Sequence, residues 1–131
     1  MQKRQLQLSL LKDSYGICKF PSDSSIPEWA LKVSLCSITR SEKELTIVCL
    51  QGIIPANTEY DSDWRCFRIG GSFDFNQIGV ISSLAAPLAE AGVSIFVVST
   101  YDTDYVLVKE EKIEQAVNVL TDNGHLIAGE E

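Results

Sequence analysis

The segment from Phe73 to Val108 limits the possible folds more than any other part of the sequence. Its first part carries apolar residues at a helical period of about 3.6, and Gly92 follows where a helix commonly ends in a left-handed residue. Two apolar runs rich in β-branched and aromatic residues come next, and such runs are typical of strands. The apolar positions of the predicted helix are Ile78, Ile81, Leu84, Ala85 and Leu88.

A short polar corner separates the two predicted strands, which cover residues 93–98 and 105–108. The corner reads Tyr101-Asp102-Thr103-Asp104 and carries two carboxylates and two hydroxyl groups. The segment therefore predicts a helix and two neighbouring strands that meet at an acidic, hydroxyl-bearing turn.

The residues on either side complete a regular order of elements. Trp64 to Ile69 is predicted to be a strand that stops at a pair of glycines. Beyond the corner, Glu110 to Asn123 has one apolar stripe and Gly124 as its stop signal, and Leu126 to Ala128 forms a short closing strand. The order β-α-β-β-α-β predicts a ferredoxin-like α+β fold with an antiparallel sheet and both helices on one face.

The first half of the chain gives weaker signals. The alternation from Leu6 to Leu10 predicts a strand with one wet face, at the edge or outside of a sheet, and Tyr15 to Phe20 is expected to pair back on it. The segment from Pro21 to Pro27 predicts a loop that leads into a short helical turn near Glu28 to Ala30.

Two further strands are predicted in this half, at Leu31 to Cys36 and at Leu45 to Leu50, on either side of a hairpin turn at Ser41 to Lys43. From Gln51 to Asp63 the chain lacks periodicity, so we place the boundary between the halves there. From the order of elements, residues 1–60 are interpreted as a degenerate copy of the unit formed by residues 61–131.

Charge and composition argue against several classes of function. The formal net charge is −7 and the basic residues cluster only at Lys3 and Arg4, so binding to nucleic-acid phosphates is not expected. No apolar run approaches the roughly 18 residues of a membrane span, which predicts a cytoplasmic protein without membrane contact. The four cysteines form no CxxC pair and His125 is the only histidine, so no metal, cofactor or catalytic triad is expected.

The stretch from Ile78 to Val108 resembles the ACT-domain family, in particular a tandem-ACT group of small bacterial proteins similar to an arginine-sensing ACT-repeat protein of animals. The resemblance is specific over Trp64 to Gly124 and loose over the first half. It implies tandem ACT repeats and a regulatory, non-catalytic fold that binds an amino acid at an interface between two ACT units. The matching motifs are the helix opening Gly79-Val80, the Pro-Leu-Ala at 87–89 and the corner Ser-Thr-Tyr-Asp-Thr-Asp at 99–104.

Carried over to this sequence, the resemblance assigns ligand binding to Gly79 and Val80 at the helix opening and to Thr100, Tyr101 and Asp104 in the corner. The first turn of a helix presents unpaired N–H groups, which suit an α-carboxylate, and Asp104 suits a cationic group. We therefore expect a free amino acid as effector, with arginine or lysine favoured. A homodimer or larger oligomer is expected because the first half lacks these motifs and open sheet edges favour pairing.

Other interpretations of the same residues stay open at this point. Gly79 is also explained by close packing of the helix on the sheet, and Asp102 and Asp104 are also explained as turn residues that bond their own backbone. Two other functions are an enzyme that uses Asp102 and Asp104 as acid and base, and a structural dimerisation module without a ligand, whose edge strands pair across a two-fold axis.

Overall fold

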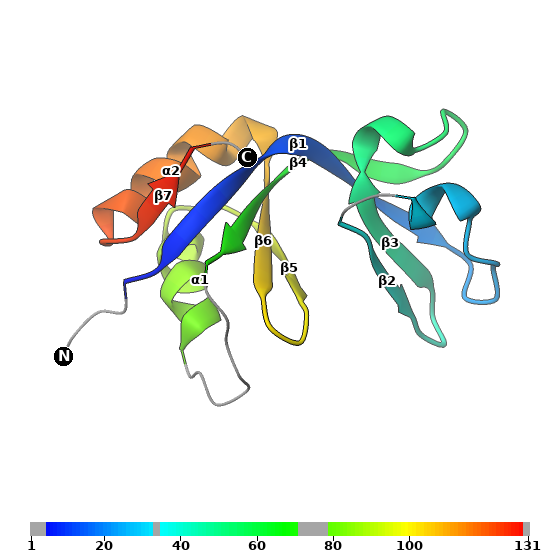
Figure 1. Ribbon diagram of the computed structural model, residues 1–131, viewed down its shortest axis with the longest axis horizontal. Helices are drawn as coiled ribbons and strands as arrows, with labels where there is room; N and C mark the ends of the chain where they lie inside the picture. Colours follow the sequence, from blue (N-terminus) through cyan, green and yellow to red (C-terminus); the bar gives the residue numbers. More distant parts are fainter. Residues whose placement is uncertain (1–4, 33–34, 71–78, 130–131) are drawn as a thin grey trace. The chain divides into compact units, whose positions relative to one another are not determined.

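The computed structural model describes residues 5–32, 35–70 and 79–129 (Figure 1). No helix among them is long and apolar enough to cross a membrane. The strands are β1 (Gln7–Phe20), β2 (Ser37–Arg40), β3 (Leu45–Leu50), β4 (Tyr60–Ile69), β5 (Ile95–Ser99), β6 (Asp104–Lys109) and β7 (Leu126–Ala128). The α-helices are α1 (Val80–Glu90) and α2 (Ile113–Asp122), and 3-10 turns occur at Glu28–Leu31, Gln51–Ile53 and Glu110–Lys112.

The described residues group into two compact units. The smaller unit runs from Asp13 to Trp64, and the larger unit takes the chain up to Lys12 and from Arg65 onward. Both boundaries fall inside a strand, so β1 and β4 each contribute residues to both units. These groupings differ from the predicted limits of residues 1–60 and 61–131 because the start of β1 belongs with the second half. That the two halves are ACT repeats stays a prediction.

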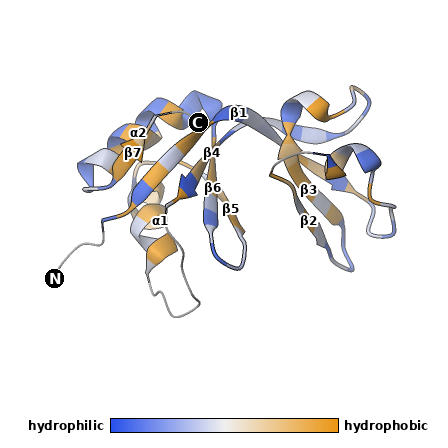
Figure 2. Cartoon of the chain, in the orientation of Figure 1, coloured by the Kyte–Doolittle hydropathy of each residue, from blue (hydrophilic) through white to orange (hydrophobic). Residues whose placement is uncertain are grey.

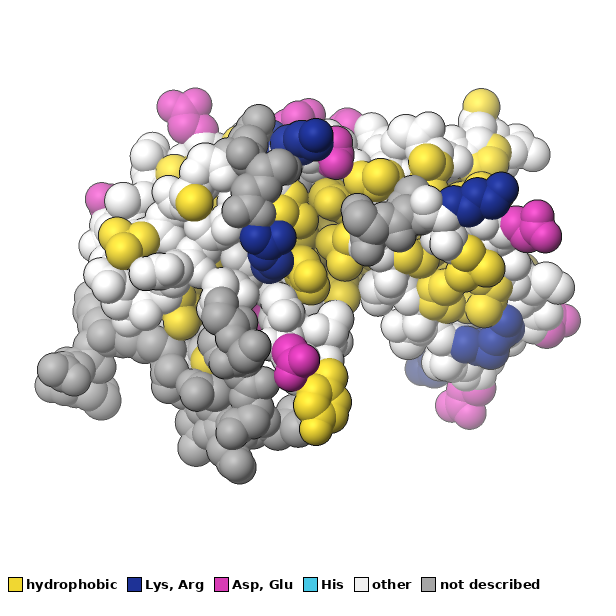
Figure 3. Space-filling model, viewed as in Figure 1, with side chains coloured by type: hydrophobic (Ala, Val, Ile, Leu, Met, Phe, Trp, Pro, Cys, Tyr) yellow, Lys and Arg dark blue, Asp and Glu magenta, His cyan; other side chains and the backbone are white. Residues whose placement is uncertain are grey.

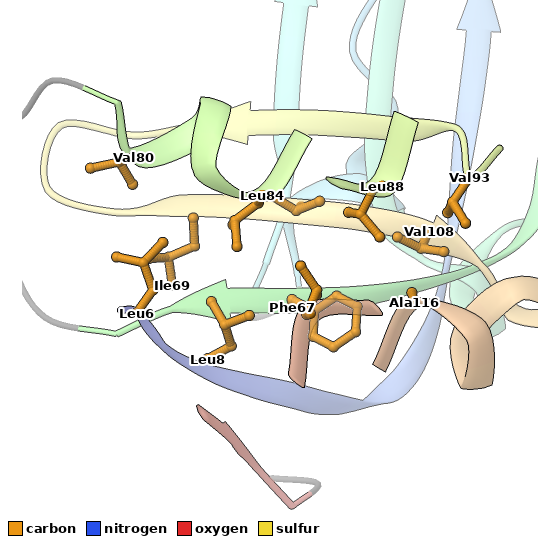
Figure 4. Close-up of a cluster of buried hydrophobic side chains, with 12 residues drawn as sticks. Leu6, Leu8, Phe67, Ile69, Val80, Leu84, Leu88, Val93, Val108 and Ala116 are labelled. Carbon is orange, nitrogen blue, oxygen red and sulfur yellow. The ribbon is translucent and has the colours of Figure 1, made fainter. Parts of the chain in front are cut away.

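The larger unit contains five strands of the sheet in the order β7-β1-β4-β6-β5, and both helices lie on one face of it (Figures 1 and 4). One core cluster joins α1 and α2 to alternate residues of the strands, which shows that the helices cover the same face. This arrangement confirms the predicted ferredoxin-like order of elements. The cluster contains Leu6, Leu8, Phe67, Ile69, Val80, Leu84, Leu88, Val93, Val106, Val108, Ala116 and Leu120.

The turn signals of the larger unit were interpreted correctly. Gly92 and Gly124 follow the two α-helices with positive φ angles of 77° and 90°, as left-handed helix ends require. Strands β5 and β6 pair antiparallel, with Ile95 opposite Val108 and Ser99 opposite Asp104. The closing strand β7 has the predicted limits.

The smaller unit is built on β3, which is hydrophobic along most of its length (Figure 2). It pairs antiparallel with β1 on one side and with β2 on the other. The β2–β3 hairpin closes through Ser41 N, which donates a hydrogen bond to Glu44 O at 2.9 Å. The hairpin turn is thus confirmed. Its core cluster contains Cys18, Ala30, Leu45, Ile47 and Cys49.

Several predictions for the first half were wrong. The strand at Leu6–Leu10 is not an edge strand, because β1 lies between β4 and β7. Tyr15–Phe20 does not pair back on it but continues the same strand and pairs with β3. The β1–β7 pair is parallel, so the sheet is not antiparallel throughout. A strand was also predicted at Leu31–Cys36, but none of the described residues in this range lies in a strand, and Leu31 ends a 3-10 turn.

Candidate functional site

The first turn of α1 begins at Gly79, whose φ of 84° is left-handed. Gly79 O accepts a hydrogen bond from Ser83 N at 3.0 Å and another from Ser82 Oγ at 3.2 Å. No side chain in the described part of the chain caps this end with a hydrogen bond. Gly79 is exposed, whereas Val80 is 4% exposed and packs into the core. The two residues predicted at the helix opening therefore differ: Gly79 is exposed at the start of α1, and the Val80 side chain anchors the helix in the core.

The turn between β5 and β6 is closed by a threonine pair. Thr100 N donates to Thr103 O at 2.8 Å, and the Thr100 hydroxyl donates to the same oxygen at 3.0 Å while accepting from Thr103 N at 3.1 Å. The Thr100 side chain thus holds the turn. Tyr101 is 78% exposed and Asp102 is also exposed, so both present their side chains outward at the tip.

Asp104 is placed differently from Asp102, because it is the first residue of β6. Side chains alternate along a strand, so Asp104 lies on the same face as Val106 and Val108, the face that the helices cover. Ser99 faces it directly across the antiparallel pair. Ser99 was not predicted as a site residue from the sequence, although the register places its hydroxyl beside this carboxylate.

The two groups of predicted residues come to the same end of the larger unit (Figures 1 and 4). The helix α1 has 11 residues and rises about 16 Å, and β5 has 5 residues and spans about the same length. Since only residues 91–94 separate them, β5 returns to the level at which α1 begins. Gly79 and Val80 thus share an end with Thr100, Tyr101 and Asp104. Asn76 to Ile78, which precede Gly79 and which we also expected to take part in holding a carboxylate, lie outside the described residues.

His125 supports this end from inside the protein. Its side chain is 2% exposed, Nδ1 accepts a hydrogen bond from Leu6 N at 3.1 Å, and Nε2 lies 3.2 Å from Ser83 O. Because Nδ1 is an acceptor, the ring proton is assigned to Nε2, which then donates to Ser83 O. The lone histidine is thus a structural residue that ties Leu6, directly before β1, to the first turn of α1, and nothing in the local sequence pattern indicated these partners.

The charges at this end are acidic, and no described group of three or more His, Cys, Asp or Glu residues has an arrangement that would hold a metal ion. On the face shown in Figure 3, the Lys and Arg side chains stand apart rather than forming a continuous basic patch. The arrangement offers a helix N-terminus, which suits an anion, and one carboxylate, which suits a cation. A ligand that carries both charges matches it.

Comparison with known proteins identifies the families that this chain resembles. Residues 59–122 match the family model of the ACT domain, and residues 13–57 match a separate model of an N-terminal domain. Over 58 residues the chain is 40% identical to the human protein called cytosolic arginine sensor for mTORC1 subunit 1. That alignment covers 44% of this chain and 18% of the sensor, so the chain matches only a small part of the sensor's length.

Solved structures match over the whole chain. A crystal structure of an Agobacterium tumefaciens protein is 38% identical, with a TM-score of 0.92, and the match covers 98% of this chain and 96% of that one. The regulatory subunit of aspartate kinase from Thermus thermophilus has a TM-score of 0.65 at 14% identity, with coverage of 95% of this chain and 100% of that one. The second similarity shows a shared fold.

Proposed function

Because this chain belongs to the ACT-domain family, we propose that it is a non-catalytic regulatory protein that binds a free amino acid. The observation that carries the proposal is the position of Asp104, on the helix-covered face and at the end where α1 begins. An amino acid presents an α-carboxylate to the helix N-terminus and a cationic group to Asp104. The similarity to a protein named as an arginine sensor supports the choice of ligand class.

Among the twenty amino acids, arginine and lysine are the favoured effectors. Each carries a second positive charge, and the acidic protein, with a net charge of −7, attracts cations over a distance. The Ser99 hydroxyl opposite Asp104 adds one more polar group for a side-chain cation. The α-amino group of any amino acid could take the same carboxylate, and for this reason the screen below includes all twenty.

The site is proposed to be completed by a second copy of the chain. In the larger unit β5 ends the strand order of the described sheet. A closed two-fold assembly would cover such an edge. Sedimentation of the protein with and without ligand tests this, and a monomer of 14.5 kDa at high concentration under both conditions would contradict it.

A thermal-shift screen of the twenty amino acids tests the function. A ligand present at about 100 times its dissociation constant stabilises the folded state by about 2.7 kcal/mol, which gives a clear rise in Tm. If no amino acid raises the Tm, the protein is not an amino-acid sensor and a ligand-free dimerisation module becomes the better explanation.

Two matched variants locate the site. Asp104→Asn should weaken binding by about 1.5–3 kcal/mol, the worth of a hydrogen bond to a charged group, measured by titration calorimetry. Asp102→Asn removes a charge from the exposed tip two residues away and should leave the affinity nearly unchanged. Equal affinities of Asp104→Asn and the parent protein for the amino acid would show that the corner is only a turn.

The helix end is tested by Gly79→Asn. Asparagine tolerates a left-handed φ, and among the described atoms a Cβ at this position meets only Ser82 Oγ, at 3.6 Å, so the fold should persist. The added side chain competes with the ligand carboxylate for the N–H groups of the first turn. We expect weaker binding with a Tm, in the absence of ligand, close to that of the parent.

A further inference from the structure

Three of the four cysteines gather on one face of the sheet in the smaller unit. Cys18 in β1 and Cys49 in β3 are both 0% exposed, and a hydrogen bond joins their side chains. Cys36 comes directly before β2, is only partly buried and packs against the cluster that contains the other two. The proposed amino-acid site uses none of these thiols.

Strand register decides which two thiols are suited to a covalent bond. The β2–β3 ladder begins with Ser37 opposite Val48, and Cys36 and Cys49 are the next residues of the two segments beyond that pair. Residues directly opposite in an antiparallel pair have Cα atoms about 4.5–5.5 Å apart, inside the range that a disulfide spans.

Cys18 has a different relation to Cys49. The β1–β3 register sets Gly16 opposite Cys49 and Cys18 opposite Ile47, so Cys18 and Cys49 are diagonal neighbours. Diagonal positions are about 7–8 Å apart, which is beyond the usual Cα separation of a disulfide. The two sulfur atoms therefore suit a hydrogen bond better than a covalent bond.

Solvent access also favours a bond between Cys36 and Cys49. An oxidant in solution reaches a sulfur atom that is at least partly exposed, and within this cluster Cys36 alone meets that condition. Once Cys36 is oxidised, Cys49 is the thiol whose place along β3 suits a bond to it.

We propose that Cys36 and Cys49 form a reversible disulfide when a hydroperoxide oxidises Cys36. Cys36–SH and hydrogen peroxide give Cys36–SOH and water. Cys49 then attacks the Cys36 sulfur, the S–S bond forms as the S–O bond breaks, and the hydroxyl group leaves with the thiol proton as a second water. Each sulfur loses one electron and the peroxide gains two. A dithiol reductant restores both thiols by exchange.

The bond would act on the edge of the smaller unit. Strand β2 ends the strand order and pairs with β3 alone among the described strands. A covalent link between Cys36 and β3 fixes the entry of β2 into the sheet, so the oxidised form should resist local opening of this edge.

The test treats the full-length chain with hydrogen peroxide, blocks the remaining thiols and identifies cross-linked tryptic peptides without reduction. Burial raises the pKa of the Cys36 thiol, so the reaction is run at about pH 8.5 to provide more thiolate. The cysteines fall on separate tryptic peptides, residues 13–19, 33–40, 44–65 and 66–68. We expect peptides 33–40 and 44–65 to be linked, and dithiothreitol to separate them.

Two variants with the same chemical change serve as controls. Cys36→Ser should abolish every cross-link, because the buried pair then lacks an accessible partner. Cys18→Ser should retain the link between 33–40 and 44–65. The proposal is overturned if peptide 13–19 is linked to 44–65, if Cys36 joins two chains, or if Cys36 proceeds to a sulfinic acid while Cys49 is recovered as a free thiol.

Discussion

Replacing His125 should reveal how strongly the buried imidazole holds the start of α1. In His125→Ala the Leu6 N–H and the Ser83 carbonyl both lose their partner, and the ring leaves a cavity. A buried polar group without a partner costs about 1–3 kcal/mol, so two such groups and the cavity should lower the free energy of unfolding by about 3–5 kcal/mol. A domain of this size has only about 5–15 kcal/mol in total.

Two conservative replacements divide this effect between the ring nitrogens. The amide oxygen of His125→Asn reaches the position of Nδ1 and can accept from Leu6 N, whereas the longer amide of His125→Gln can donate to Ser83 O in place of Nε2. Each should therefore recover part of the loss. The measurements are urea unfolding followed by circular dichroism and hydrogen exchange of the Leu6 amide. An alanine variant within about 0.5 kcal/mol of the parent, with unchanged Leu6 exchange, would refute the assignment.

Three further predictions concern other positions. Gly70→Ala should lower the free energy of unfolding by about 1–3 kcal/mol, because its Cβ would lie 2.8 Å from the backbone oxygen of Gln7. Gly52→Ala is the control, since its Cβ would meet no described atom within 4 Å, and equal Tm values of the two variants would contradict this prediction. Gly16→Ala should lower the Tm as well, since its Cβ would lie 2.5 Å from Ile54 Cδ1, and an unchanged Tm would show that this side chain moves aside easily. Burial raises the pKa of Cys66 from 9.0 to about 12, so the folded state holds the thiol proton more tightly than the unfolded state. The free energy of unfolding should therefore be unaffected by this group below pH 9 and fall toward pH 12. Cys66→Ala should reduce that fall when unfolding is measured as a function of pH.

The elements of the second half could be predicted because each has a local signal. Helix α2 has an apolar stripe and a terminal glycine, and β5 and β6 have dense β-branched runs around a polar turn. The fold followed from their order, since a chain of short connections has few ways to arrange them.

The first half was harder to predict because its long strand has no uniform pattern. Leu6 to Leu10 and Tyr15 to Phe20 gave separate strand signals, and this suggested two short strands instead of β1. Gly16 is needed within β1 because Ile54 and Tyr60 occupy the space that a side chain would fill. Contacts between residues far apart in the sequence, such as β1 with β7, leave no local signal at all.

The predicted site shows the same division between local and distant information. The helix opening and the acidic corner are local motifs, and the sequence identified both. The bond from His125 to Ser83 joins residues 42 positions apart, and the facing of Ser99 and Asp104 depends on a register that only the paired strands define. Sequence reasoning could not find either.

The register also bears on the choice between a binding protein and an enzyme. An acid–base pair requires two carboxylates that share a proton or a substrate, and therefore one environment. Asp102 lies exposed in the turn, whereas Asp104 lies in the strand on the helix-covered face, opposite a serine. A single carboxylate in that position suits a cationic group, and it does not share with Asp102 the common environment that proton transfer between the two would need. The geometry therefore favours recognition of a charged ligand over catalysis, and it makes Asp104, rather than the pair, the residue on which the proposed function depends.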